Sequence, residues 1–462
     1  MSRRKLRLFS LELLQFRYFY AKIKKNTADA VKNGEMCMKK YDLIVVGGGL
    51  SGVASAIAAA RGGMKVLLCE KTNALGGAAA TMLVMPFMPN ATKIGDEVRQ
   101  LSRGIFEEVL EEMKAFDGRS MVAPKSGNNH FDEETMKIVL NRMCIEAGVE
   151  LLFHAYLCGV SREGDRITGA SFATVAGTLT FESDYFVDAT GDATLSTLAG
   201  CETILGREND PLCQPMTLCF RMGGVDMEKF NEKKRTYVNA EYQARQARGE
   251  IKNPRENVLT FSTYHPDVLH LNTTRVVKLN PTDPFDVTKA ELIAREQVVE
   301  MVDFLKSLPD CGMENAYLLS TALEIGVRES RMVVCEHMLN EMELKNCTVF
   351  EDAIATGNYD IDIHNPEGSG TSHYYFKPGE YYTIPYRSLI PKKVENLLVV
   401  GRCIGATHEA QASIRIMPIT TTMGEAAGHA LAQCHERGLT NVREVDIAAL
   451  HEVFEKSNVS YR

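Results

Sequence analysis

Short apolar runs recur along the chain and predict the strands of a parallel sheet. Four of them are rich in Val, Ile and Leu, and they cover Leu43–Val46, Lys65–Cys69, Tyr185–Asp188 and Asn396–Val400. A strand buried on both faces shows such a continuous run rather than an alternation of apolar and polar residues. An alanine-rich stretch, Val53–Arg61, separates the first two runs and predicts a helix. The pattern therefore predicts an α/β fold built from strand–helix–strand units.

Helical and hairpin patterns fill most of the remaining chain. Helical spacing covers Phe131–Gly148 and Phe285–Leu308, and a further helix is predicted to begin at Pro418, because proline is favoured in the first helical turn. Residues 150–182 suggest hairpin strands with a turn at Gly164-Asp165. Residues 226–257 are highly charged and predict an exposed helical excursion, and 441–462 suggest a final surface helix and tail.

The charge balance separates the first forty residues from the rest. The 462 residues carry a net charge of −8, which argues against nucleic acid as a partner. Residues 1–40 alone hold eleven basic and three acidic side chains, and we interpret them as a basic N-terminal extension. Three interpretations stay open: an upstream translation start, a twin-arginine export signal at Ser2-Arg3-Arg4, or a basic amphipathic helix on a membrane surface.

The uncharged stretches and the cysteines indicate a soluble, cytoplasmic protein. Leu43–Ala60 and Thr72–Thr92 are long enough to suggest membrane spans, but their glycines and prolines favour turns, so a membrane location is not expected. The twelve cysteines are scattered without a Cys-x-x-Cys pair. Reduced thiols in the cytoplasm fit this usage better than a disulfide framework or a redox-active disulfide.

A glycine motif follows the first predicted strand. Gly47, Gly49 and Gly52 form Gly-x-Gly-x-x-Gly immediately before the alanine-rich helix, and Glu70 closes the second strand. Gly47 permits a tight turn, Gly49 lets the backbone approach a pyrophosphate, and Gly52 lets the helix pack on the strand. Glu70 can bond both ribose hydroxyls and would repel a 2′-phosphate. The sequence therefore predicts a dinucleotide site that disfavours NADP.

Later segments favour FAD over NAD. Gly76 and Gly77 stand in a long loop of small residues, which is consistent with backbone packed against an extended cofactor. Ala189-Thr190-Gly191-Asp192 follows a strand, and Asp192 is either a cofactor contact or a helix N-cap. The helix expected from Pro418 carries Gly424, Ala426, Ala427 and Gly428, and its N-terminus would stabilise negative charge on a flavin ring.

The set of motifs resembles a known family. These are VVGGGLSGVASAIAAA, LGGAAAT, VDATGDATLSTLAG, GVRESR, YDIDIH, IPYRSLIP and NLLVVGRCIGATHEAQASIRIMP, in this order over roughly residues 40–435. The chain is similar to the FAD-dependent oxidoreductases of the glutathione-reductase-like superfamily, which includes fumarate-reductase flavoproteins. The resemblance implies that the ADP half is held by Gly47, Gly49, Gly52, Glu70, Gly76 and Gly77. It also implies that Gly401 and Arg402 run beside the flavin. Arg402 departs from many relatives, which place an aspartate after this glycine.

The resemblance and the element pattern together predict the domains. We expect a discontinuous, Rossmann-type FAD-binding domain at residues 41–205 and 380–440, with an α+β substrate or cap domain inserted at 206–379. A second Gly-x-Gly-x-x-Gly unit with a following acid is missing from the sequence. A separate NAD(P)H domain is therefore not expected, and either transient NAD(P)H binding or a separate electron carrier could feed the flavin.

Several side chains are candidates for the chemistry beside a flavin. Either Arg328 or Arg331 could clamp a substrate carboxylate, with a domain-interface salt bridge as the alternative for each. Arg387 is a further candidate for anchoring the substrate. His364 alternates with Asp360 and Asp362 and suggests an acid/base group with its orienting carboxylate. That spacing could also hold a metal, which flavin chemistry does not require, so no metal is expected. His408 and His373 are further candidates, each with a structural role as the alternative.

Three functions remain open from the sequence. The first is an FAD-dependent oxidoreductase that moves a hydride between flavin N5 and a small organic substrate, as a dehydrogenase or reductase, with Arg328, His364 and Arg387 in the leading roles. The second is an FAD-dependent monooxygenase or oxidase. The third is a flavin-binding subunit that passes electrons to a partner, which an exposed middle block would favour and a closed pocket would not.

Overall fold

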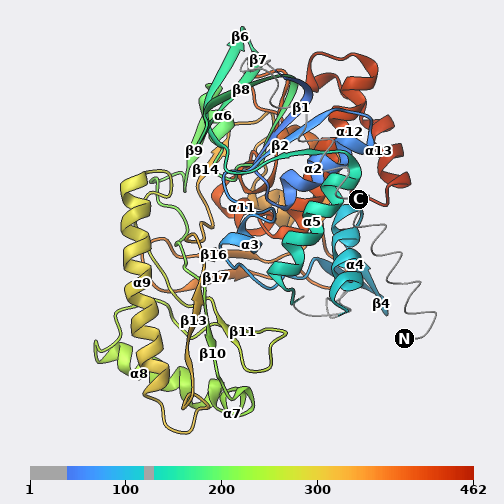
Figure 1. Ribbon diagram of the computed structural model, residues 1–462. Coiled ribbons are helices and arrows are strands. Elements are labelled where there is room, and N and C mark those ends of the chain that lie inside the picture. The colour runs from blue at the N-terminus through green and yellow to red at the C-terminus, as the bar shows by residue number, and fades with distance from the viewer. Residues whose placement is uncertain (1–38, 119–129) are drawn as a thin grey trace, which may run out of the picture.

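The structure, a computed structural model, describes residues 39–118 and 130–462. The interpretations of the basic extension concern residues that lie outside this range, apart from Lys39 and Lys40. Two lobes are visible in Figure 1, with the first strands and helices in the upper lobe and α9 flanking the lower one. Among the described residues, no helix combines the length and apolarity needed to cross a membrane.

The main sheet lies in the upper lobe and follows the pattern of apolar runs. Its order is β5-β2-β1-β8-β7-β6, with β19 also paired to β8. The strands β1, β2, β5, β8 and β19 pair in parallel. Their bounds are Lys40–Val46, Val66–Cys69, Glu150–Leu152, Gly177–Asp188 and Leu397–Val399. The expected α/β fold with a parallel sheet is confirmed at this level.

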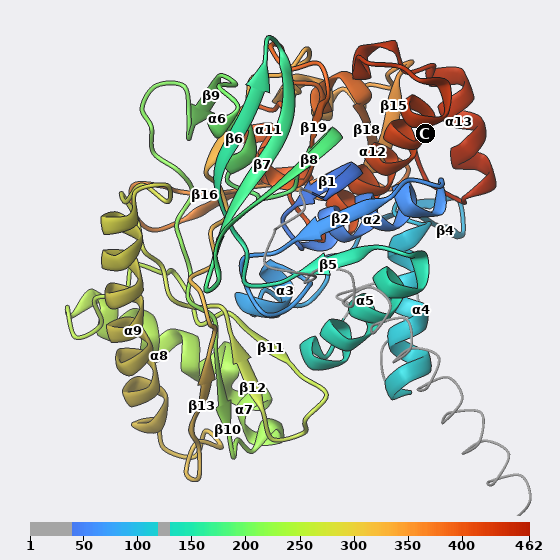
Figure 2. The ribbon, with the colours of Figure 1, turned by 45° about the horizontal axis from the view of Figure 1, so that its top comes forward.

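Strand β8 joins a parallel and an antiparallel part of the same sheet. Its residues Glu182–Asp188 pair in parallel with β1, whereas Gly177–Glu182 pair antiparallel with β7. β7 (Arg166–Thr174) and β6 (Tyr156–Glu163) form the hairpin that the turn at Gly164-Asp165 predicts. Figure 2 shows this hairpin rising from the upper lobe.

Close contact between α2 and α12 brings the C-terminal part of the chain to the first motif. These helices cover Leu50–Arg61 and Met417–Arg437. A Cβ on Gly424 would lie 2.0 Å from the Ser51 carbonyl oxygen, and one on Gly428 would lie 2.4 Å from that of Ser55. The Ser55 hydroxyl donates to the Gly424 carbonyl at 2.8 Å. Only glycine permits this approach, which explains the small residues expected in the helix that contains Pro418.

The lower lobe has its own antiparallel sheet and core. The sheet order is β11-β12-β10-β13, and the strands cover Thr260–Ser262, Leu269–Leu271, Phe220–Gly223 and Tyr317–Thr321. Helix α9 (Pro284–Lys306) buries Ala290, Ala294, Val298 and Met301 in a cluster with β10 and β12. The predicted helical excursion forms α7 (Met227–Lys233), a π-helix at Lys234–Val238 and α8 (Asn239–Ala247).

Short strands connect the two lobes and bring the hairpin β16–β17 between them (Figure 1). This hairpin pairs Ile361–His364 with Thr371–Tyr374, and β15 (Ala353–Gly357) pairs with β18 (Tyr382–Pro385). The remaining strands are β3 (Ala91–Ile94), β4 (Glu97–Gln100), β9 (Thr203–Leu205) and β14 (Arg331–Val333). The remaining α-helices are α3 (Ala78–Thr81), α4 (Ile105–Asp117), α5 (Glu133–Ala147), α6 (Thr194–Leu198), α10 (Glu341–Lys345), α11 (His408–Ile414) and α13 (Ile447–Lys456). Four-residue and three-residue 3₁₀ turns cover Tyr386–Leu389, Gly401–Cys403 and Val442–Glu444.

Candidate functional site

A first cavity runs along the carboxyl ends of β1, β2 and β8. Its lining includes eight of the nine residues that the sequence assigns to a cofactor, and Gly52 is the ninth. Gly47 has φ +105°, and a Cβ there would lie 2.4 Å from the Ala189 carbonyl oxygen. A Cβ on Gly52 would lie 1.9 Å from the Gly47 carbonyl oxygen. Both glycines are therefore required by contacts within the protein itself.

Gly49 differs from its two neighbours in the motif. It has φ −65°, and among the described residues the nearest atom to an added Cβ is the Gly77 Cα at 4.0 Å. That Cβ would enter the cavity rather than the protein. Gly49 is also the N-cap of α2, so it offers no capping side chain, and the first turn contains no acidic residue. The free N–H groups at this end of α2 fit a diphosphate in the cavity.

Gly76 and Gly77 form the opposite wall. Their φ angles are +111° and +51°, and the N–H of Gly76 donates to the Gly48 carbonyl at 2.8 Å. Glu70 is buried beside them, where one carboxylate oxygen accepts from the Gly48 N–H at 2.6 Å. Its other oxygen accepts from the Thr72 N–H at 2.8 Å and from the Thr72 hydroxyl at 2.9 Å. These bonds hold the carboxylate at the end of β2, where a ribose is expected.

Asp192 and Arg402 are paired side by side in the wall of the cavity. The Arg402 guanidinium donates to Asp192 Oδ1 at 2.5 Å, to the Gly191 carbonyl at 2.8 Å and to the Val327 carbonyl. Asp192 is not the N-cap of α6, because Ala193 occupies that position. The carboxylate that stabilises this turn is Asp188, whose oxygens accept from Thr190 and Ser196. Gly401, with φ +85°, places Arg402 at the end of β19.

A second cavity, of about 470 Å³, adjoins the first. It lies between the lobes, where β11, β16 and β17 contribute to its wall together with the loop of residues 82–88. The residues that line both cavities are Ala78, Met82, Arg402, Arg415 and Met417. Met417 begins α12, so the positive end of that helix dipole points to the junction. A ligand at the junction would be in contact with both spaces.

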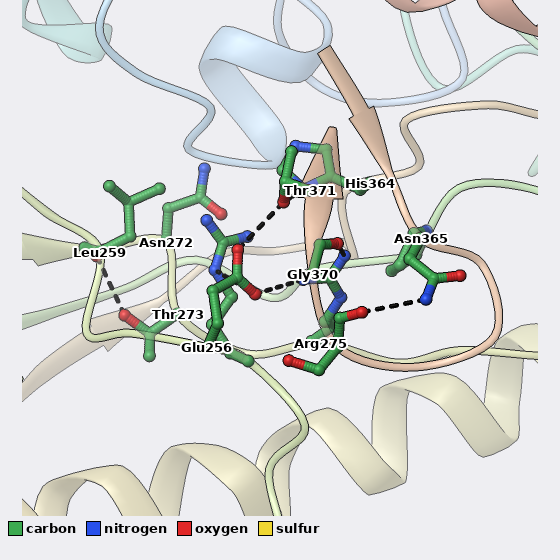
Figure 3. A network of polar contacts seen from close by, with 12 residues as sticks. Glu256, Leu259, Asn272, Thr273, Arg275, His364, Asn365, Gly370 and Thr371 are labelled. Carbon is green, nitrogen blue, oxygen red and sulfur yellow. Dashed lines mark hydrogen bonds and ion pairs between the residues drawn. The ribbon is translucent and has the colours of Figure 1, made fainter. Parts of the chain in front are cut away.

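The hairpin β16–β17 brings His364 to the second cavity. Nε2 of His364 lies 3.3 Å from Asp362 Oδ2, and Nδ1 lies 3.1 Å from the Thr371 hydroxyl. That hydroxyl also lies 3.0 Å from Glu256, which accepts in turn from Arg275 at 2.6 Å (Figure 3). Ionised Glu256 and ionised Asp362 can only accept, so the Thr371 hydroxyl donates to Glu256 and the N–H at Nε2 of His364 donates to Asp362. In the neutral ring Nδ1 then carries no proton, and it lies on the side of Thr371.

Burial and charge keep His364 neutral. Burial, followed by the positive charges of Arg328 and Arg415, lowers the pKa of His364 to about 3, against the opposing effect of Asp362. Although burial opposes it, the proton donors and cations around Asp362 keep the pKa of that carboxyl well below its usual range. Tyr359 adds a bond from its hydroxyl to Asp362 Oδ2 at 3.1 Å. His364 is therefore uncharged at neutral pH.

Asp360 and His373 continue the acidic cluster toward the surface. Nδ1 of His373 lies 2.5 Å from Asp360 Oδ2 and 3.7 Å from Asp362 Oδ1. One ligand atom from each of Asp360, Asp362 and His373 lies within 4.8 Å of the others, which makes this group a candidate for a metal. The sequence pattern paired the two aspartates with His364 instead. Asp362 is already in contact with His364 and with Arg415, whose guanidinium lies 3.4 Å away.

The other predicted catalytic residues lie in three different surroundings. Arg328 lines the second cavity, whereas Arg331 lies in β14 and donates to the Asp192 carbonyl at 3.3 Å. His408 is buried behind the cavity wall, where Glu329 at 2.7 Å raises its pKa although burial lowers it. Arg387 lies outside the linings of both cavities, with its side chain 53% exposed and paired with Asp352 at 2.9 Å.

Two arginines of the second cavity were missed by sequence reasoning. Arg415 stands in the SIRIMP motif just before the helix that contains Pro418, and its place in this motif could have identified it as a cavity residue. Arg255 lies in the charged segment that was expected to be exposed, yet it is only 5% exposed. The local sequence pattern gives no signal of this burial.

Comparison with known proteins identifies the family of the chain. A sequence profile for the family described as FAD dependent oxidoreductase matches residues 42–454. A segment of 94 residues is 34% identical to 3-hydroxybenzoate 6-hydroxylase of Klebsiella oxytoca, and it covers 19% of this chain and 23% of that enzyme.

Several solved structures are similar over most of the chain. A geranylgeranyl bacteriochlorophyll reductase-like protein from Thermoplasma acidophilum has a TM-score of 0.45 at 12% identity, covering 91% of this chain and 84% of the other. The p-nitrophenol 4-monooxygenase of Pseudomonas putida has a TM-score of 0.45 at 10% identity, covering 90% and 84%. A flavin-dependent brominase has a TM-score of 0.44 at 13% identity, covering 91% and 84%.

Proposed function

The chain belongs to the family of FAD dependent oxidoreductases, and from this premise we propose that it transfers a hydride between FAD in the first cavity and a small organic substrate in the second. The enzyme is an oxidoreductase and its cofactor is FAD. The observation that carries the proposal is the junction, because five residues line both cavities. A substrate in the second cavity would therefore lie against whatever part of the cofactor reaches that junction.

The walls of the first cavity support an assignment of the ADP half. Gly49, Gly77 and the N-terminus of α2 would accommodate the diphosphate, since a Cβ at Gly49 would occupy open space. Glu70 would bond the ribose. Asp192 and Arg402 lie next along the cavity, toward the junction, and would contact the ribityl chain. When bound, FAD supplies the hydride acceptor or donor and carries two electrons.

His364 would move the proton that accompanies the hydride. The ring is neutral at neutral pH and faces Asp362, whose negative charge would stabilise the imidazolium formed when the ring takes up a proton. Asp362 at Nε2 and Thr371 at Nδ1 fix the orientation of the ring, and Glu256 holds Thr371 in turn. The N-terminus of α12 and the Arg402 guanidinium would stabilise negative charge at the junction.

The second candidate is a monooxygenase or oxidase. It is favoured by the 94-residue similarity to 3-hydroxybenzoate 6-hydroxylase, a segment that covers less than a quarter of that enzyme. The third interpretation, an electron-transfer subunit without its own substrate site, is opposed by the cavity between the lobes. NADH, NADPH or a separate electron carrier remains the proposed partner for the other half-reaction.

Oxygen reactivity separates the two enzyme candidates. The FAD-loaded protein is reduced by light under anaerobic conditions and mixed with air-saturated buffer. If the enzyme transfers a hydride to an organic substrate, oxygen should reoxidise the reduced flavin slowly. An organic oxidant should reoxidise the flavin even when oxygen is absent. Fast reoxidation by oxygen with peroxide formation, and no response to any organic oxidant, would replace the proposal with the second candidate.

A further inference from the structure

Arginines from distant parts of the chain converge on the second cavity. Arg255 follows α8, Arg328 follows β13, and Arg415 ends α11. With Arg402, which is paired with Asp192, four arginines line the cavity, whereas its lining carboxylates are Glu256 and Asp362. His364 is neutral and adds no charge to this balance. An enclosed space with surplus cations favours a negatively charged ligand.

Arg255 is the least compensated of these side chains. It is 5% exposed, and its Nε is buried without a hydrogen-bond partner in the described chain. Its nearest carboxylate, Glu256, lies 3.9 Å away. That carboxylate already accepts from Arg275 at 2.6 Å and from Thr371 at 3.0 Å. A buried guanidinium in this state destabilises the free protein unless an anion joins it.

Arg328 and Arg415 add to the same demand. Arg328 donates to the Pro215 carbonyl at 2.8 Å, to the Thr217 hydroxyl and to Asn272 at 3.3 Å, all of which are neutral acceptors. Burial, followed by the positive charges of Arg255 and Arg415, lowers the pKa of Arg328 to about 9. Nε of Arg415 is also buried without a partner in the part of the chain that the structure describes. Each of the three guanidinium groups thus retains donors for a further acceptor.

We propose that the substrate is an organic anion with two carboxylates, bound by Arg255, Arg328 and Arg415 in the second cavity. The inference rests on the proposed function and names the substrate class of the same site. Guanidinium groups bind planar carboxylates through two parallel hydrogen bonds. The carbon skeleton would lie against apolar side chains of the wall, which are Met82, Val84, Met85, Leu259 and Phe261. A cavity of about 470 Å³ suits a small molecule.

Ligand titrations of the FAD-loaded protein test the class of anion. Acetate, malonate, succinate and inorganic phosphate are added separately, and the thermal midpoint and the visible flavin absorbance are recorded. We expect a dicarboxylate to raise the midpoint, to perturb the flavin spectrum, and to bind at least tenfold more tightly than acetate. Equal affinity for acetate and the dicarboxylates, or tightest binding by phosphate, would overturn the assignment of two carboxylates.

Arg255→Gln separates ligand binding from a structural role. Since Arg255 lacks a close partner, we expect the ligand-free midpoint to stay the same or rise, while dicarboxylate affinity falls at least tenfold. A structural role predicts the opposite pattern, with a lower midpoint and unchanged affinity, and that result would overturn the proposal. Arg387→Gln is the matched control, because its side chain is exposed outside both cavities and should leave affinity unchanged.

The two proposals fail in different ways. A protein that exchanges hydrides with uncharged substrates but binds none of these anions would contradict the dicarboxylate and leave hydride transfer standing. A protein that binds dicarboxylates through Arg255, but whose flavin reacts only with oxygen, would contradict hydride transfer and leave the anion site standing.

Discussion

The two cavities are built from different parts of the polypeptide. Backbone and small residues form the first, so that Gly47, Gly49 and Gly77 matter for the side chains they lack. Long charged side chains from both lobes form the second, with Arg255, Arg328 and Arg415 on its wall. The first is suited to a cofactor with a constant shape, whereas the second can change its substrate through single side chains. The difference indicates which substitutions should remove the cofactor and which should change only the chemistry.

This difference also explains what the sequence could predict. The residues of the first cavity follow strands within short segments, and the glycine spacing reports a local turn, so Gly47, Glu70 and Gly76 could be identified without a structure. Residues of the second cavity come from segments between 78 and 417 that meet only after the lobes assemble.

His364 and Arg387 illustrate the limit of the sequence. His364 could be proposed because a two-residue period places Asp362 beside it on one strand face, and the structure brings the two together. Arg387 stands in an equally suggestive motif but pairs with Asp352 on the surface. Neither the exposure of Arg387 nor the burial of Arg255 could be inferred from neighbouring residues, because both depend on packing between distant segments.

The strongest test of the first cavity is Gly52→Ala. A Cβ there would lie 1.9 Å from the backbone oxygen of Gly47, so the turn cannot accommodate it without moving a strand. We expect the free energy of unfolding to fall by about 3 kcal/mol and FAD to be lost. Denaturant unfolding measures this change, with Gly368→Ala as the control because open space surrounds that position and its φ is not positive. A variant of unchanged stability would contradict the role given to this contact.

His364→Gln tests the second cavity without disturbing the first. Glutamine keeps a hydrogen-bonding side chain but cannot exchange a proton in the same way, so we expect turnover to fall by about 10²- to 10⁴-fold. FAD content should stay at the level of the wild-type protein, since His364 lies outside the first cavity. Steady-state kinetics and the flavin spectrum give both values. Full turnover would remove His364 from the proposed proton transfer.

Gly49→Ala separates cofactor binding from folding. Its φ of −65° suits alanine, and the added Cβ would meet the cavity rather than the protein. We expect the apoprotein to unfold within about 0.5 kcal/mol of the wild type, as surface substitutions do. FAD affinity, measured by fluorescence titration, should fall at least tenfold. Wild-type affinity would mean that the diphosphate does not lie against Gly49.

Acid should destabilise the lower lobe, where His270 is buried in β12. Burial, followed by the charges of Arg221 and His130, lowers the pKa of His270 to about 3, from 6.5 in the unfolded chain. The native state therefore binds fewer protons than the unfolded state between these values, so stability falls as the pH falls. The slope is about 1.4 kcal/mol per pH unit for this residue. Denaturant unfolding of His270→Leu should show a shallower loss, whereas the exposed His265→Leu should retain the full slope.

The smallest effect is expected for Arg387→Gln. The pair with Asp352 is exposed on the arginine side, so its loss should cost about 0.5 kcal/mol or less. Turnover should stay within about twofold of the wild-type value. A large loss of activity would bring Arg387 back as a catalytic residue and would contradict the division into two cavities.

The position of the flavin ring decides whether the two cavities act together. A crystal structure of the FAD-loaded protein would place the dinucleotide relative to the residues named above. We expect the ADP half against Gly49 and Glu70, and the ring at the junction between Met82, Arg402 and Met417. A ring held away from this junction, with the second cavity separated from it by protein, would contradict hydride transfer between the two cavities.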